Sequence, residues 1–313
     1  MPIAQDELSK NAIGGTERMK NGLAERVDPE ILDKFQIICS RVRDIDSKLI
    51  PIYWLHDLPE DPESEHLRAG GWNKFERNVF VSNWQMQAYI KNFGMPWYKC
   101  RVLQNAIDPI DFVPKKQGKI KIIYHTTPHR GLNILVPVFT KLAEKYDNIE
   151  LDVFSSFKIY GWEDRDKPFE QLFDMCRNHP QINYHGFQPN DVVRKALQDA
   201  HIFAYPSIWL ETSCIAMMEA MSAGCLCLHP NYGALYETAS NFTWMYQYRE
   251  DMRDHMIIMY SLLDKAINDV MSDNVQESLQ TTRNYINTFY NWDRRAQEWT
   301  NFLTTILRDK KII

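Results

Sequence analysis

The segment FAYPSIWLETSCIAMMEAMSAGCLCLHPNYGALYET, residues 203–238, decides how the fold of this chain is interpreted. An apolar, strand-like run ends at Pro206–Ser207, and a second one, CLCLHP, follows Gly224. Between them lie Glu211, a polar TSC triplet and a helix-like stretch that carries Glu219. A strand, a helix and another strand in this order predict a βαβ unit within a parallel sheet.

The same alternation extends over most of the chain. From residue 119, short apolar strands alternate with amphipathic helices, and FTWMY at 242–246 is a candidate sixth strand. The first half has strand-like runs too, among them FQIICS, PIYWLH, NVFVS and CRVLQ. The segment NAIDPIDFVPKKQG has two prolines and little periodicity, so we place a domain boundary there. The pattern predicts an α/β protein of two Rossmann-like, doubly wound domains that face each other across a cleft.

Composition and charge exclude several classes of protein. The chain has 313 residues, 44% of them apolar, and a net charge of −5, which is globular composition with an acidic balance. Nucleic-acid binding draws on Lys and Arg, so none is expected, and the basic run at 115–121 is interpreted as a solvated linker flank. The N-terminus lacks a signal-peptide pattern, and no apolar run approaches the ~20 residues of a membrane span.

The six cysteines are scattered and none forms a C-x-x-C pair, so neither a zinc site nor a redox dithiol is indicated. Reduced thiols in a cytoplasmic protein are the simplest account. The D-x-D strings at 44–46 and 164–166 do not end apolar strands, so they are not interpreted as metal sites. We expect no essential metal and no cofactor other than the substrates.

The opening segment also carries chemistry. A helix is expected to begin near Thr212–Ser213, and the unpaired N–H groups of such a helix start form an anion site for a phosphate or diphosphate. Glu219 lies among apolar neighbours, where a carboxylate can accept both hydroxyls of a ribose. Gly224 is expected to end the helix in the left-handed conformation.

These residues form a pattern that resembles the signature of family 4 of the retaining glycosyltransferases, which have the GT-B fold. The pattern is a strand ending in Pro-Ser, a Glu, seven residues, a second Glu, Ala-x-x-x-Gly and a strand, then a Gly and a Glu. Its positions here are Pro206, Ser207, Glu211, Glu219, Ala220, Gly224, Gly233 and Glu237.

Further marks of that family occur in the same order along the chain. They are GGTE (14–17), WLHD (54–57), VSNW (81–84), QNAID (104–108), TTPHRGL (126–132) and YNW with a later Trp (290–299). The last resembles the final helix that crosses back to the first domain. The resemblance implies a first, acceptor-side domain at 1–117 with the helix at 287–313, and a nucleotide-sugar donor-binding domain at 118–286.

Two departures from the family pattern affect the expected site. The segment IAQDELSKNA before the glycine loop is a poor strand, so the first domain is expected to lack the usual first strand. In the loop that opens the second domain, Arg130 is the clear basic residue, and His125 or Thr126 stands where another is common.

The resemblance implies a hexosyltransferase-type glycosyltransferase that acts with retention and without metal on a glycan, lipid-linked or protein acceptor. The donor is a nucleotide diphosphate sugar of the UDP or GDP type. Its implied catalytic residues are His56, Glu211 and Arg130, with Glu219 on the ribose. The implied diphosphate-binding residues are Gly14, Gly15, Arg130, Thr212, Ser213 and Cys214.

Other functions remain open at this stage. A nucleotide-sugar epimerase of the same fold also needs a diphosphate site and a carboxylate such as Glu211. A non-catalytic nucleotide-sugar-binding scaffold is a second alternative, and a DNA-glycosylating transferase, disfavoured by the acidic pI, is a third. The aromatic loop FGMPWY (93–98) and the charged segment 59–77 are candidates to face the acceptor or a membrane surface.

Overall fold

The structure, a computed structural model, describes residues 13–313. The expectations about a missing first strand and about a signal peptide concern residues outside this range. The described chain divides into two compact units: one runs to Asp108 and resumes at Phe289–Ile313, and the other is Pro109–Thr288. Each unit is described by itself below.

The first unit is built on a four-stranded, fully parallel sheet in the order β1-β2-β3-β4. Because neighbours follow one another in chain order, the described strands show no reversal of the winding. The strands are β1 (Phe35–Cys39), β2 (Ile50–Leu55), β3 (Arg77–Phe80) and β4 (Cys100–Val102).

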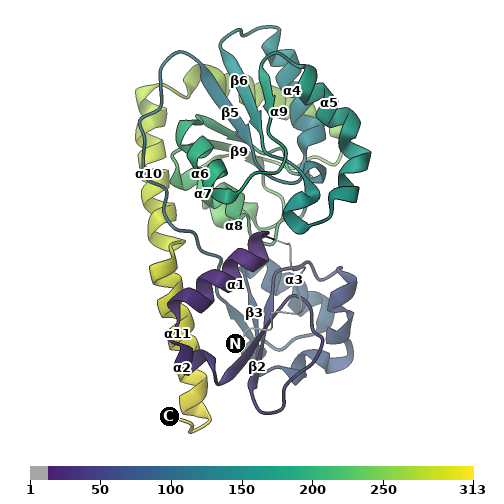
Figure 1. The fold of residues 1–313 in the computed structure, drawn as a ribbon, viewed down its shortest axis with the longest axis vertical. Helices are drawn as coiled ribbons and strands as arrows, with labels where there is room; N and C mark the ends of the chain where they lie inside the picture. The colour runs from purple at the N-terminus through teal and green to yellow at the C-terminus, as the bar shows by residue number, and fades with distance from the viewer. Residues whose placement is uncertain (1–12) are drawn as a thin grey trace. The chain divides into compact units, whose positions relative to one another are not determined.

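Helices and turns cover this sheet, and the C-terminal helix α11 packs beside α1 and α2 (Figure 1). Trp299 of α11 is fully buried with its ring centroid 4.7 Å from that of Trp54. A Cβ on Gly22 would lie 2.1 Å from the Trp292 ring, so glycine allows α11 to approach α1 closely. The elements are α1 (Gly15–Arg26), α2 (Pro29–Leu32), η1 (Pro62–Lys74), α3 (Asn83–Phe93), η2 (Trp97–Lys99) and α11 (Trp292–Asp309), the η elements being 3₁₀ turns.

The second unit contains a six-stranded parallel sheet in the order β10-β9-β8-β5-β6-β7. The order reverses between β5 and β8, which makes this sheet doubly wound as expected and places its topological switch point there. The candidate sixth strand at 242–246 is confirmed as β10. The strands are β5 (Ile120–Tyr124), β6 (Ile149–Val153), β7 (Ile182–Tyr184), β8 (Ile202–Ala204), β9 (Leu226–Pro230) and β10 (Trp244–Tyr246).

Helices cover both faces of the second sheet: α4 packs on α5 and α9, while α6 packs on α7 (Figure 1). The helices are α4 (Leu132–Ala143), α5 (Glu170–Asn178), α6 (Asn190–Asp199), α7 (Ile215–Ser222), α8 (Leu235–Ala239), α9 (Met252–Asp269) and α10 (Asp273–Phe289). Three 3₁₀ turns complete the unit: η3 (Pro128–Arg130), η4 (Phe157–Tyr160) and η5 (Glu163–Phe169).

The end of α7 follows the expected pattern. Gly224 adopts φ +78°. The amide of Cys225 donates to the carbonyl of Ala220, and the amide of Gly224 donates to the carbonyl of Met221. This pair of bonds is the Schellman arrangement that closes a helix on a left-handed glycine.

The basic run at 115–121 differs from expectation at its first residue. Lys115 is not a solvated flank, because its ammonium donates to the carbonyls of Leu197, Gln198 and Ala223 at 2.9–3.0 Å. These carbonyls lie at the C-terminal ends of α6 and α7, where a cation satisfies groups that the helices leave open. In the described part of the chain, no helix is both long and apolar enough to span a membrane.

Candidate active site

The loops after β5 and β8 meet at the switch point of the second sheet, and glycines allow their backbones to touch. A Cβ on Gly131 would lie 2.2 Å from the carbonyl oxygen of Pro206, and the glycine has φ +130°. A Cβ on Gly233 would lie 2.5 Å from the carbonyl oxygen of Glu211, whose oxygen also accepts from the Ala234 amide at 2.7 Å. These contacts fix the position of the backbone that carries Glu211.

Arg130 and Glu211, both named as site residues from the sequence, form an ion pair in which Glu211 is buried and Arg130 is partly buried. Arg130 Nη1 donates to Glu211 Oε1 at 2.8 Å, and the Tyr205 hydroxyl donates to the same oxygen. The second terminal nitrogen of Arg130 makes a longer bond of 3.4 Å to the Tyr160 hydroxyl. Its guanidinium also lies over the Trp209 ring, 5.7 Å from the centroid. The sequence singled out both residues but did not predict that they pair, and their two tyrosine partners carry no pattern that singles them out.

Arg130 stays protonated and positively charged at neutral pH. Burial lowers the pKa of Arg130, but the Glu211 carboxylate, together with Tyr160, Tyr205 and Cys214, raises it well above its usual range. Burial, and then the charge of Glu211, raises the pKa of Tyr205 well above its usual range, so this residue remains a hydrogen-bond donor at neutral pH. The Arg130 guanidinium is thus a permanent cation at the carboxyl end of the sheet.

Several buried polar atoms around this cation have no hydrogen-bond partner. Nε of Arg130 is one, and the side chains of Thr127 and Ser155 each contribute another. Thr127 follows β5, and Ser155 follows β6. Because most buried polar atoms in folded proteins are paired, a gathering of unpaired ones indicates a place where a polar ligand binds.

The start of α7 corrects one expectation. The helix begins at Ile215 rather than near Thr212–Ser213, and its cap residue Cys214 makes no capping side-chain bond. The physical reason is a contact with residues beyond the helix, since Gly233 and Ala234 hold the backbone of Glu211 outside it. The predicted amide donors of residues 212–214 therefore belong to the loop and the cap, and burial raises the pKa of the Cys214 thiol well above its usual range.

Glu219 is buried as predicted, but other protein groups already bind it. Asn190 Nδ2 and Arg194 Nη1 donate to its Oε1 at 3.1 and 3.2 Å. The other terminal nitrogen of Arg194 donates to the Pro109 carbonyl at 3.1 Å. Asn190 and Arg194 are four residues apart on α6, so they share one helix face. That spacing in PNDVVRKALQDA was the available sequence signal, and it was missed.

The remaining predicted residues, Gly14, Gly15 and His56, lie in the first unit. Gly14 caps α1 and Gly15 is its first residue, as the glycine turn predicted. His56 directly follows β2, and burial lowers its pKa to about 3, so its imidazole is neutral at physiological pH. Gln85 donates to the carbonyls of Leu55 and Asp57, on either side of His56, at 3.3 and 2.8 Å, which holds this strand end in place.

Carboxylates accompany His56 at the same strand end. Burial raises the pKa of both Glu17 and Asp57, and the charge of Asp57 adds to the shift of Glu17, so the two side chains are neighbours. A bond from Ser40 counteracts part of the shift of Asp57. The first unit therefore gathers Glu17 near the start of α1 and Asp57 after β2.

No group of three or more His, Cys, Asp or Glu side chains in residues 13–313 is arranged to hold a metal ion. The D-x-D string at 164–166 has a structural use, because Asp166 accepts from the amide of Phe157 at 2.8 Å and from the Ser156 hydroxyl at 2.5 Å.

The two parallel sheets with their helices, and the C-terminal helix α11 that packs on the first unit, define a GT-B glycosyltransferase fold. Solved structures of that fold align over most of the chain. A glycosyltransferase from Rickettsia africae ESF-5 aligns with TM-score 0.69 and 14% identity, over 96% of this chain and 84% of its own. HepE of Anabaena, solved in complex with UDP-glucose, aligns with TM-score 0.67 and 16% identity, over 82% and 73%.

A family model and curated relatives match part of the sequence. Residues 105–257 match the family described as Glycosyl transferases group 1, a range that includes Arg130, Glu211 and Glu219. A phosphatidylinositol N-acetylglucosaminyltransferase subunit of Homo sapiens is 25% identical over 209 residues, which are 63% of this chain and 39% of the relative. The Arabidopsis thaliana protein of the same name is 23% identical over 71% of this chain and 47% of its own length. The chain thus spans less than half the length of these curated relatives, and it is a homologue of glycosyltransferases.

Proposed function

We propose that this chain transfers a sugar from a nucleotide diphosphate sugar, of the UDP or GDP type, to a glycan, lipid-linked or protein acceptor. The observation that carries the proposal is Arg130, a charged guanidinium at the switch point whose buried Nε donor has no acceptor. Ligands of open α/β sheets bind at such a point. A diphosphate oxygen would satisfy the donor and gain the charge-assisted bond.

Leaving-group stabilisation is the chemical role that Arg130 fits. Cleavage of the bond between the sugar and the diphosphate leaves negative charge on the departing oxygen. A fixed cation in a partly buried site stabilises that charge without reorganisation. We propose that Arg130 supplies it, helped by the amides of Thr212, Ser213 and Cys214 ahead of α7. Since this cation needs no metal, the proposed transfer is metal-independent.

The two glutamates would then bind the donor's hydroxyl groups. Glu211 is held by Arg130 and Tyr205, and we assign it to the hydroxyls of the transferred sugar. Glu219 is assigned to the ribose, whose hydroxyls would join or replace its bonds from Asn190 and Arg194. A buried carboxylate with several donors suits a diol because each hydroxyl donates one hydrogen bond.

The first unit would contribute Gly14, Gly15 and His56 to the reaction. Glycines at a helix start leave room for a phosphate against the backbone. His56 is neutral and immobilised by the loop that Gln85 holds, so it would hydrogen-bond the sugar without adding charge. Retention of the anomeric configuration needs no protein nucleophile if the acceptor attacks the face that the diphosphate leaves, so Asp57 is not assigned as one.

The cellular setting is also part of the proposal. None of the six cysteines forms a disulfide, and all but Cys100 are buried. Thiols in place of disulfides support the proposal of a reducing, cytoplasmic location.

Donor binding is the first test. We would measure ligand-induced thermal stabilisation with UDP-, GDP- and ADP-sugars in the presence of EDTA, for the parent chain, Arg130→Ala and Glu219→Ala. Arg177→Ala is the matched control, since this exposed arginine pairs with Glu170 and Asp174 of α5 and lies over the ring of Tyr184, none of which is assigned to the donor site. Stabilisation by one nucleotide class that is lost in both site variants supports the proposal, and no stabilisation by any donor contradicts it. Product analysis without acceptor then separates transfer from epimerisation.

A further inference from the structure

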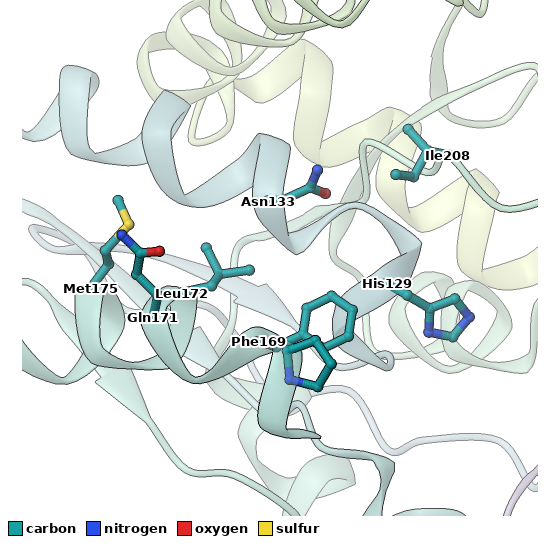
Figure 2. Close-up of a pocket in the computed structure, with 8 residues that line it drawn as sticks. His129, Asn133, Phe169, Gln171, Leu172, Met175 and Ile208 are labelled. Atoms are coloured by element: carbon teal, nitrogen blue, oxygen red, sulfur yellow. The ribbon is translucent and has the colours of Figure 1, made fainter. Parts of the chain in front are cut away.

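A cavity of about 550 Å³ lies in the second unit, outside the set of residues assigned above (Figure 2). Its walls come from η3, the first turn of α4, the junction of η5 with α5, and the loop after β8. Figure 2 shows Gln171, Leu172 and Met175 on one side of the cavity, with His129 and Ile208 on the opposite side. Its volume lies within the range of small-molecule sites, about 300–1,000 Å³.

No lining residue of this cavity carries a charge at neutral pH. Three have hydrogen-bonding side chains, namely His129, Asn133 and Gln171, and the others are apolar, with Phe169 and Leu172 among them. Burial, reinforced by the positive charges of Arg130 and Arg165, lowers the pKa of His129 to about 4. Its imidazole is therefore neutral, with one nitrogen to donate and one to accept.

Two of the polar groups have unmet hydrogen-bonding capacity. Nδ1 of His129 and Oδ1 of Asn133 are both buried without a partner. The His129 ring is held in place, since it stacks on Phe157 with centroids 5.0 Å apart and meets the edge of Trp209 at 4.8 Å. A fixed ring with an unpaired nitrogen is suited to a ligand that offers a matching hydroxyl.

The chemistry of the lining selects among ligand classes. A phosphate or carboxylate would find no cation among the lining residues. A hydrocarbon chain would leave the polar atoms of His129 and Asn133 buried and unpaired, which is unfavourable. A sugar ring fits both features, because its hydroxyls donate and accept while its C–H faces pack on apolar side chains such as Phe169 and Leu172.

The cavity adjoins the candidate donor site. His129 directly precedes Arg130, and Ile208 lies three residues before Glu211. The Ile208 amide also donates to the Arg130 carbonyl at 3.3 Å, so the two walls are tied to the backbone of the proposed cation. A ligand in the cavity is thus held against the loop that carries Arg130.

We propose that this cavity binds an uncharged sugar ring of the acceptor glycan, away from the ring that receives the transferred sugar. The inference rests on the proposed function and narrows its acceptor to a neutral glycan. His129, Asn133 and Gln171 would bond the hydroxyls of that ring, and Leu172 and Phe169 would contact its C–H face.

The test uses the full chain and saturation-transfer NMR with methyl glucoside, methyl mannoside, methyl N-acetylglucosaminide, maltose and chitobiose, each at millimolar concentration. Inorganic phosphate and octanol are the charged and hydrocarbon probes. Leu172→Trp fills the cavity, Asn133→Ala removes an acceptor, and Val192→Trp on an exposed site of α6 is the control. UDP binding is measured on every variant.

We expect a neutral saccharide to bind the parent chain and Val192→Trp, and to bind at least about tenfold more weakly to Leu172→Trp and Asn133→Ala. UDP affinity should stay the same in all four proteins, which shows that the variants are folded. Saccharide binding that Leu172→Trp leaves unchanged would overturn the proposal, as would binding of only phosphate or only octanol, or of no probe. Failure of UDP to bind the parent chain would instead contradict the proposed donor site. The saccharide binding of the variants would still decide the proposal for the cavity.

Discussion

Two buried arginine–glutamate pairs lie in the second unit, and they differ in how fully their donors are used. Arg194 uses both terminal nitrogens on protein acceptors, Nη1 on Glu219 and Nη2 on the Pro109 carbonyl. Arg130 also uses both terminal nitrogens, Nη1 on Glu211 and Nη2 on the Tyr160 hydroxyl, yet its buried Nε has no acceptor. A buried ion pair by itself is weak evidence for function. The unmet donor is what separates the candidate ligand site from a structural contact.

The surroundings of the Arg194 pair agree with a structural role. Ser222, on the same helix as Glu219, accepts from the Ile110 amide at 2.8 Å and donates to Asn287 at 2.6 Å. Pro109 and Ile110 begin the second unit, and Asn287 lies just before its end. The helix that carries Glu219 is therefore bonded to both segments where the chain enters and leaves the unit.

The largest effect is expected for Arg130→Ala. Turnover should fall by about 10²–10³-fold, because the charge on the leaving diphosphate loses its fixed cation. Arg130→Lys should recover part of the loss, since it restores the charge without the guanidinium geometry. Steady-state rates at saturating donor check this prediction. A rate in Arg130→Ala equal to that of the parent chain would contradict the assignment of Arg130, rather than Arg194, to the diphosphate.

Arg194→Met should act mainly on stability. It leaves the Glu219 carboxylate buried without its cation, at a cost of about 3 kcal/mol in the free energy of unfolding. Urea denaturation measures the change, and Arg194→Met combined with Glu219→Leu should recover much of it. A single variant as stable as the parent chain would show that the pair has no structural role.

Gly233→Ala tests whether the backbone contact positions Glu211. The added Cβ would approach the Glu211 backbone to 2.5 Å, and alanine would also have to adopt φ +62°. We expect a loss of about 2 kcal/mol in unfolding free energy, together with weaker donor binding. Gly94→Ala is the control for the cost of placing alanine at a positive φ, since Gly94 has φ +63° and open space where the Cβ would lie. Equal effects in the two variants would mean that the contact with Glu211 is unimportant.

Glu219→Gln should produce a smaller, specific change. If Glu219 binds the ribose, the preference of the chain for UDP over 2′-deoxy-UDP should fall by about tenfold, which is about 1.4 kcal/mol. Calorimetric dissociation constants for the two nucleotides give this ratio. An unchanged ratio would assign Glu219 to structure alone, through its bonds to Asn190 and Arg194.

The smallest effect concerns pH. With its pKa lowered to about 3, His56 stays neutral from pH 5 to 8, so it contributes no change in kcat/KM over that range. Below the ordinary histidine pKa the unfolded chain takes up a proton that His56 in the folded chain does not, so stability falls as pH decreases from about 6.5. An inflection of kcat/KM near pH 6.5 that disappears in His56→Gln would contradict the neutral assignment.

Much of this could be predicted from the sequence, for identifiable reasons. The strands of the second unit are short apolar runs between helices, and β10 was found from only FTWMY. Arg130 and Glu211 were found because a local motif carries each of them. Their partners Tyr205 and Tyr160 were missed, since the sheet order that joins these loops is not written in any single segment.

Other details depend on tertiary contacts that a local pattern does not contain. The helix α7 begins at Ile215, later than expected, because Gly233 contacts and holds the backbone of Glu211. These two residues are more than twenty positions apart in the sequence. Lys115 sits in a basic run that suggests solvent exposure, yet two helix ends that fold near it accept its bonds. In both cases the deciding neighbour is remote in sequence.

The most direct test of the central claim compares UDP binding by calorimetry in the parent chain, Arg130→Ala and Arg194→Ala, at a temperature where all three are folded. The account predicts that Arg130→Ala loses at least about tenfold in affinity, whereas Arg194→Ala stays within about threefold of the parent chain. Equal losses, or a larger loss in Arg194→Ala, would contradict the assignment of the unmet Arg130 donor to the diphosphate.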